Sequence, residues 1–232
     1  MTDPRITQLA ENLINNAICL KAGENVLIET TDTPEELSTE LIKAVEKAQG
    51  NAFVRNSNSR VRRQSIKSAT EAQIKLEAEL SLAEMKQMQA YIAIRGANNA
   101  MENGDIDDEK MLMYRKLTKE TLDYRVNKTK WCVLRWPNPS MAQGAKMSTE
   151  AFEDFYFKAC LADYPKMKSA AQNLIDLMNK TDKVRLVAKD TDITFSIKGI
   201  PAVPCCGNMN IPDGEVYTAP VQGSIEGVIH YN

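Results

Sequence analysis

The chain has 232 residues, which suits one large domain or one domain with part of a second and is enough to bury a substantial core. Charged residues make up 26% and the net charge is −2, which excludes the global positive field that drives non-specific nucleic-acid binding. The first residues lack a basic end followed by an apolar run, and no stretch has the roughly 18 uninterrupted apolar residues of a membrane span, so we expect a cytoplasmic protein with no nucleic-acid or membrane partner.

The N-terminal part alternates helical and strand patterns. Asp3 and Pro4 are typical of a helix start, and the apolar positions after them predict a helix to Ala17. A capping box at Thr33–Glu36 opens a second helix. Further helices are expected over residues 70–88 and 107–125, and short strands over residues 26–28, 52–54, 91–94 and 131–136. This alternation predicts the α/β class, with a mostly parallel sheet flanked by helices.

The pattern changes toward the C-terminal end of the sequence. Two more helices are expected over residues 148–160 and 165–180. After Thr181, residues 184–188 and 193–197 alternate with period two and predict an antiparallel hairpin, and short β segments follow at residues 216–218 and 225–231. We therefore expect an N-terminal α/β domain over residues 1–180 and the first strands of a β-rich domain over residues 181–232.

Signals for nucleotide or phosphate binding are weak. No G-x-G-x-x-G follows a strand, and no G-x-x-x-x-G-K-[ST] is present. The loop after Ile94 lies where ligands of α/β proteins bind, but its glycines do not match a motif, which favours an ordinary connection. A local basic cluster contains Arg55, Arg60, Arg62, Arg63 and Lys67. Because the overall charge is negative, a solvated or salt-bridged helix face is the preferred interpretation of this cluster.

Cysteine and histidine provide no complete catalytic set. The five cysteines are irregularly spaced, which fits neither a disulfide framework nor a zinc ribbon. Cys205 and Cys206 are adjacent and are a candidate redox or metal pair, but no C-x-x-C accompanies them and we expect ordinary apolar thiols. His230 is the single histidine, and a structural or exposed role is favoured over a catalytic triad.

Glu215 is the candidate metal ligand. The residues Pro212-Asp213-Gly214 are a strong turn signal, and a carboxylate fixed directly after a turn has the rigidity that a metal ligand requires. Considered alone, the same pattern also fits a solvated glutamate.

Longer motifs resemble one family along essentially the whole chain. They are RITQLAENLINNAICLKAGENVLIE (residues 5–29), RWPNPSMAQ (135–143), MSTEAFEDFYF (147–157), TDITFSIKGIPA (191–202) and NIPDGEVYTAP (210–220). Together they are similar to the aminopeptidase T / aminopeptidase S family of bacterial metalloaminopeptidases.

The resemblance implies a homodimeric enzyme that removes N-terminal residues from peptide substrates with metal-activated water. Its C-terminal domain would hold two divalent metal ions (zinc, cobalt or magnesium), and Glu215 would be the first metal ligand. The family's other ligands and its catalytic tyrosine belong to a later segment that this sequence lacks. We therefore expect residues 181–232 to be the beginning of the metal-binding catalytic domain, and this N-terminal portion to be inactive by itself.

Two alternatives remain open from the sequence. The chain is also compatible with a non-catalytic interaction or dimerisation module. It is compatible as well with an α/β domain that binds a small molecule through the loop after Ile94.

Overall fold

The computed structural model describes residues 3–231 and divides into two compact units. The first contains the described residues up to Ala162 together with Gly207–Pro212, and the second contains Asp163–Cys206 and the described residues from Asp213 onward. The helix that precedes Lys180 belongs to the second unit. The division of the protein into domains at residues 180 and 181 stays a prediction.

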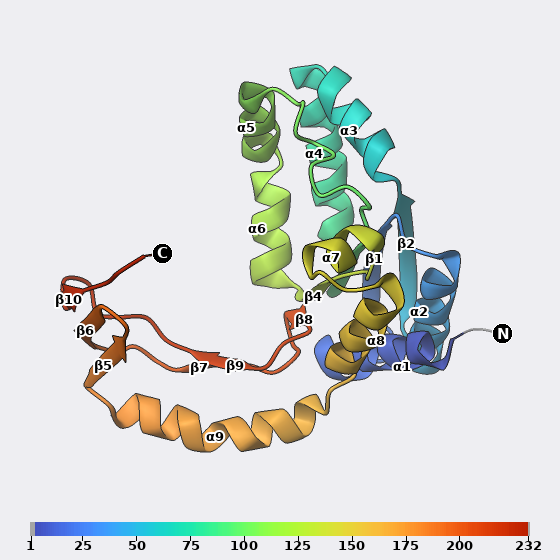
Figure 1. The fold of residues 1–232 in the computed structure, drawn as a ribbon. Coiled ribbons are helices and arrows are strands. Elements are labelled where there is room, and N and C mark those ends of the chain that lie inside the picture. Colours follow the sequence, from blue (N-terminus) through green and yellow to red (C-terminus); the bar gives the residue numbers. More distant parts are fainter. Residues whose placement is uncertain (1–2, 232) are drawn as a thin grey trace. The chain divides into compact units, whose positions relative to one another are not determined.

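A five-stranded sheet lies at the centre of the first unit (Figure 1). Its strand order is β2-β1-β3-β4-β8, and every neighbouring pair is parallel. The strands are β1 (Asn25–Thr31), β2 (Asn51–Ser57), β3 (Ala90–Arg95), β4 (Lys130–Arg135) and β8 (Asn210–Ile211). The predicted α/β class with a mostly parallel sheet is confirmed.

Helices cover both faces of this sheet. The helices of this unit are α1 (Pro4–Asn12), its π-helical continuation η1 (Leu13–Ala17), α2 (Glu35–Lys47), α3 (Ser59–Ser68), α4 (Glu71–Met85), α5 (Asp108–Leu117), α6 (Lys119–Lys128), α7 (Pro139–Gly144) and α8 (Thr149–Cys160). Leu27 of β1 packs with Met85 of α4 and Tyr124 of α6. Val26 and Ile28 point to the opposite face because side chains alternate along a strand, and both are fully buried. Burial on both faces explains why the strand reads as an unbroken apolar run.

Three elements of the first unit differ from the sequence-based expectation. The single helix expected over residues 107–125 is divided at Thr118, whose hydroxyl donates to the carbonyl of Tyr114 (2.9 Å) and competes with continuous helical pairing. Helix α7 has no counterpart among the expected helices. Strand β8 was not among the expected strands and lies within residues 181–232, but it pairs with β4 through Val133 and Asn210.

Arg5 joins the N-terminal helix to α8. Its guanidinium donates hydrogen bonds to Asp3 (2.7 Å), Glu153 (2.7 Å) and Asp154 (2.6 Å). It also lies 4.7 Å from the centre of the Phe157 ring, at cation–π distance. Residues far apart in the sequence are therefore held together by one side chain.

The second unit is built from one helix and short antiparallel strands. They are α9 (Tyr164–Lys180), β5 (Lys183–Ala188), β6 (Thr191–Ser196), β7 (Val203–Cys205), β9 (Glu215–Tyr217) and β10 (Glu226–Val228). The predicted hairpin is confirmed, since β5 and β6 pair antiparallel with Val184 opposite Phe195. Of the β segment expected over residues 225–231, only β10 is a strand, and it pairs with β6.

Across residues 3–231, every helix is too short or too polar to cross a membrane.

The burial of β1 leads to a stability prediction. Ile28→Ala removes a fully buried side chain from this central strand and is expected to lower the free energy of unfolding by about 2–5 kcal/mol. Ile42→Ala is the matched control, because Ile42 of α2 is 43% exposed. Urea unfolding followed by circular dichroism measures both changes. Equal losses in the two variants would contradict the assignment of β1 to the core.

Candidate functional site

Glu215 begins β9, in the second unit. Strand β9 pairs antiparallel with β7, and Glu215 lies opposite Cys205. The Glu215 side chain is exposed. The sequence-based expectation of a carboxylate at a strand start, directly after a turn, is confirmed as a local geometry; its role as a metal ligand stays a prediction.

The turn before Glu215 requires glycine. Gly214 has φ +147°, and a Cβ added there would lie 3.2 Å from Sδ of Met167 on α9. The backbone N–H of Gly214 donates to the carboxylate of Asp213 (3.0 Å). Both the backbone conformation and the close approach of α9 disfavour a larger residue at this position.

The carboxylates of this turn act on the neighbouring thiols. Burial, followed by the negative charges of Asp213 and Glu215, raises the pKa of the Cys205 thiol above its ordinary value. Burial and Asp213 raise the pKa of the Cys206 thiol in the same direction. A raised pKa keeps a thiol protonated at neutral pH, whereas nucleophiles and metal ligands are thiolates. This agrees with the interpretation of the pair as ordinary thiols.

The side chains near Glu215 do not fit a metal centre. Within residues 3–231, no three His, Cys, Asp or Glu side chains are grouped so that they could hold a metal ion. His230 is exposed, and its backbone N–H donates to the hydroxyl of Thr191 (3.0 Å). A site for two ions needs several protein ligands, of which Glu215 supplies one.

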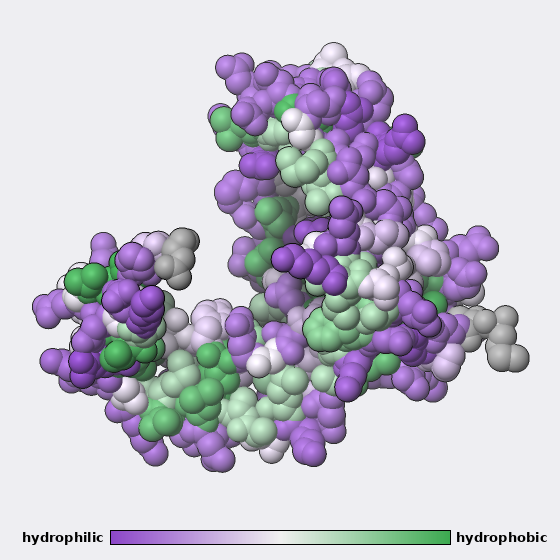
Figure 2. All heavy atoms as spheres, in the orientation of Figure 1, coloured by the Kyte–Doolittle hydropathy of each residue, from purple (hydrophilic) through white to green (hydrophobic). Residues whose placement is uncertain are grey.

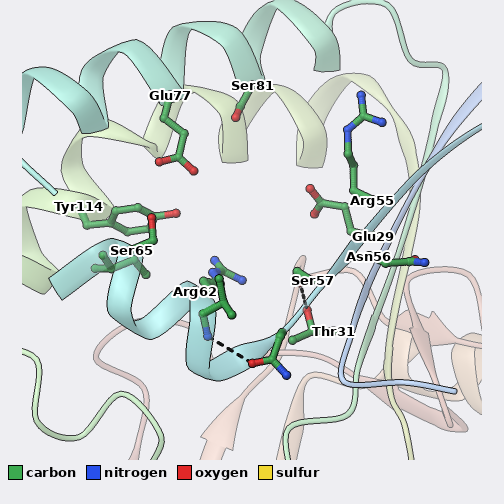
Figure 3. Close-up of a pocket in the computed structure, with 13 residues that line it drawn as sticks. Glu29, Thr31, Arg55, Asn56, Ser57, Arg62, Ser65, Glu77, Ser81 and Tyr114 are labelled. Carbon is green, nitrogen blue, oxygen red and sulfur yellow. Dashed lines mark hydrogen bonds between the residues drawn. The ribbon is translucent and has the colours of Figure 1, made fainter. Parts of the chain in front are cut away.

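A second candidate site is a cavity of about 630 Å³ in the first unit, which we call the sheet-edge cavity. It is lined by the carboxyl-terminal ends of β1 and β2 and by helices α3, α4 and α5. Figure 3 shows the carboxylates of Glu29 and Glu77, the side chain of Arg62 and the hydroxyl of Tyr114 pointing into the same space. The volume lies in the range of small-molecule sites.

Local hydrogen bonds fix the rim of the sheet-edge cavity. The amide oxygen of Asn58 accepts from the backbone N–H groups of Arg60 (3.0 Å) and Val61 (3.2 Å) and so caps α3. The amide nitrogen of Asn58 donates to Asp32 (2.7 Å). The cap therefore holds the start of α3 against the end of β1.

The predicted basic cluster separates into two groups. Arg63 and Lys67 bind Asp105, with Lys67 Nζ 2.8 Å from its carboxylate, and Arg55 forms an ion pair with Glu84. These pairs agree with a salt-bridged helix face. Arg62 lines the sheet-edge cavity, and so does Arg55 beside its ion pair with Glu84.

No sequence pattern indicated the other residues of the cavity. Glu77 and Ser81 belong to α4 and Tyr114 belongs to α5, so they come together only when these helices fold over the ends of the strands. The loop after Ile94 was the ligand site in one of the alternatives left open by the sequence, whereas the sheet-edge cavity is formed at the ends of β1 and β2. Only the general rule that ligands bind at the carboxyl ends of parallel strands pointed toward this region.

The capping role of Asn58 can be tested by substitution. Asn58→Ala is expected to lower the free energy of unfolding by about 1 kcal/mol, because two N–H groups at the start of α3 lose their acceptor. Asn58→Ser keeps an oxygen at the cap and is expected to retain most of the stability. Thermal or urea unfolding distinguishes the two, and an Ala variant as stable as the Ser variant would contradict the cap.

Comparisons with known proteins give one family. The family model described as "Thermophilic metalloprotease (M29)" matches residues 2–232. A search of curated protein sequences found no significant match.

Solved structures with related folds were also found. Wild-type AmpT from Thermus thermophilus is 17% identical with a TM-score of 0.77, and the match covers 97% of this chain and 63% of that chain. The 2,5-dihydroxypyridine dioxygenase of Pseudomonas putida KT2440 is 11% identical with a TM-score of 0.52, and the match covers 98% of this chain and 59% of that chain. The chain therefore spans less than two thirds of the length of these relatives. At such identities the likeness shows the fold alone.

Proposed function

The chain belongs to the M29 family of thermophilic metalloproteases, and from this membership we propose that it is part of a metal-dependent aminopeptidase that removes N-terminal residues from peptides. The observation that carries the proposal is the match of the family model to residues 2–232. The related fold of AmpT agrees with it. Membership in a metallopeptidase family implies a divalent metal cofactor.

Within this proposal Glu215 is one carboxylate ligand of the metal site. Its side chain is exposed, and it stands at the start of β9, directly after Gly214 with its positive φ angle. Both features support this role. The remaining ligands for the two ions, zinc, cobalt or magnesium, would come from residues outside this sequence. No step of the reaction follows from Glu215 alone.

We further propose that the 232-residue chain is inactive by itself. The match to AmpT leaves more than a third of that chain uncovered. In the second unit, the buried residues among those described are Tyr164, Ile197 and Ala202. This unit therefore has only a small core of its own, which agrees with a domain of which a part is missing.

Large apolar side chains of the second unit face solvent. Figure 2 shows apolar residues gathered along α9 and the strands of this unit. Examples that are more than one third exposed are Leu174, Leu177, Leu186, Val187, Val203 and Tyr217. Exposed apolar surface of this kind marks a contact region. In our proposal the rest of the catalytic domain covers it.

A cytoplasmic location, peptide substrates, a homodimeric assembly and the absence of nucleic-acid and membrane partners are parts of the same proposal. The alternative of an interaction or dimerisation module rests on the same exposed apolar residues. The two hypotheses differ in what they predict for the gene.

Activity measurements test the proposed inactivity. With cobalt or zinc added, the chain is expected to release leucine from a leucyl-peptide no faster than its Glu215→Gln variant, because one carboxylate cannot hold the metal pair. Isothermal titration of the same metals is expected to give no tight stoichiometric binding. Hydrolysis or tight metal binding that disappears in Glu215→Gln would show that this chain contains a complete site.

The gene provides the complementary test. The reading frame is expected to continue past codon 232 and to encode further histidine and acidic residues, which would supply the missing ligands. A stop codon at that point would contradict the proposal and favour the interaction module.

A further inference from the structure

A second cavity adjoins the sheet-edge cavity. It has a volume of about 270 Å³ and lies against β1 and β3 beneath α4, α5 and α6; we call it the inner cavity. Four residues line both cavities: Glu29, Arg62, Ser81 and Tyr114. The two cavities are therefore parts of one hollow, within the first unit.

The inner cavity lies at a special point of the sheet. From β1 the chain first adds β2 on one side and then places β3 on the other side, so the strand order reverses between β1 and β3. Arg95 ends β3 and lines the inner cavity, as do Leu27 and Glu29 of β1. In open α/β sheets, ligands bind outside the carboxyl ends of the strands at such a switch point.

Three guanidinium groups of the inner cavity have no acidic partner. Within residues 3–231, no carboxylate lies at ion-pair distance from Arg62, Arg95 or Arg125. The guanidinium of Arg125 lies 4.7 Å from the centre of the Tyr91 ring, and its buried Nε has no hydrogen-bond partner among the described residues. Buried donors in native proteins are normally paired, since an unpaired one costs about 1–3 kcal/mol.

The acidic residues of the hollow leave this positive charge available. Glu84 forms an ion pair with Arg55. Glu29 accepts a hydrogen bond from the hydroxyl of Tyr91, which remains protonated because burial, followed by the charge of Glu29, raises the pKa of Tyr91. Glu77 lines only the sheet-edge cavity. Positive charge thus dominates the inner cavity. The sheet-edge cavity is lined mainly by hydroxyl, amide and carboxylate groups, together with Arg62 and with Arg55, which is paired with Glu84.

We propose that this hollow binds a small anionic metabolite. Its acidic group, a carboxylate or a phosphate, lies in the inner cavity and is bound by Arg62 and Arg95, with Arg125 at the side of the Tyr91 ring. Guanidinium groups bind both kinds of oxyanion through paired hydrogen bonds. The polar remainder of the ligand lies in the sheet-edge cavity, near Ser65, Tyr114 and Glu77. This site is independent of the proposed peptidase function, because Glu215 belongs to the other unit.

Calorimetric titration of the 232-residue chain tests the proposal. Inorganic phosphate and succinate are the probes, each at low ionic strength, and divalent metal is removed from the protein beforehand with a chelating resin. At least one is expected to bind saturably with one site per chain. Arg62→Gln and Arg95→Gln are each expected to weaken binding about tenfold or more, the effect of losing a charge-assisted hydrogen bond. Arg60→Gln is the matched control, because Arg60 lies on the same helix as Arg62 but does not line either cavity.

The outcomes separate the sources of the anion. Binding of phosphate alone identifies a phosphorylated ligand, and binding of succinate alone identifies a carboxylic acid. Comparable binding of both identifies a site that recognises negative charge without distinguishing phosphate from carboxylate. Circular dichroism confirms that the variants are folded. No saturable binding of either probe would overturn the proposal, as would an equal loss of affinity in Arg60→Gln. Neither result bears on the peptidase function, since the titration is carried out on protein that has been freed of divalent metal.

Discussion

The parallel pairing of β1 with β2 and β3 is the constraint on which the rest of the first unit depends. Parallel strands need long crossover connections, and here the helices of those connections cover both faces of the sheet. The same pairing directs the carboxyl ends of β1, β2 and β3 to one edge. Side chains from separate crossovers, such as Arg62 and Tyr114, therefore meet there and enclose a hollow.

Most of the fold was predictable because the longer strands of the central sheet are recognisable from their own apolar residues. Val26 to Ile28 and Tyr91 to Ile94 are apolar without interruption, which is what burial on two faces requires. The break at Thr118 was not predictable from periodicity, because threonine hydroxyls make the same bond to the carbonyl four residues earlier within unbroken helices. Strand β8 was not predicted, because a strand of two residues, Asn210 and Ile211, is too short to show a periodic pattern.

One of the two candidate sites was predicted from the sequence and the other was not. Glu215 became a candidate because its turn and strand are local features and because the motif around it resembles that of a known family; the structure places it at the start of β9. The hollow in the first unit was missed, because its arginines come from α3, β3 and α6, and nothing in the sequence states that these elements meet. The distinction between paired Arg63 and unpaired Arg62, adjacent in the chain, exists only in three dimensions.

The pairing of β8 with β4 has a consequence for biosynthesis. β4 receives its outer partner only from Asn210 and Ile211, after residues 136–209 have left the ribosome. Until then β4 is the edge of a nascent parallel sheet, with unpaired backbone groups that are a template for intermolecular association. Between the translation of β4 and that of β8, the backbone groups of Val133 and Leu134 are therefore open to pairing with other chains.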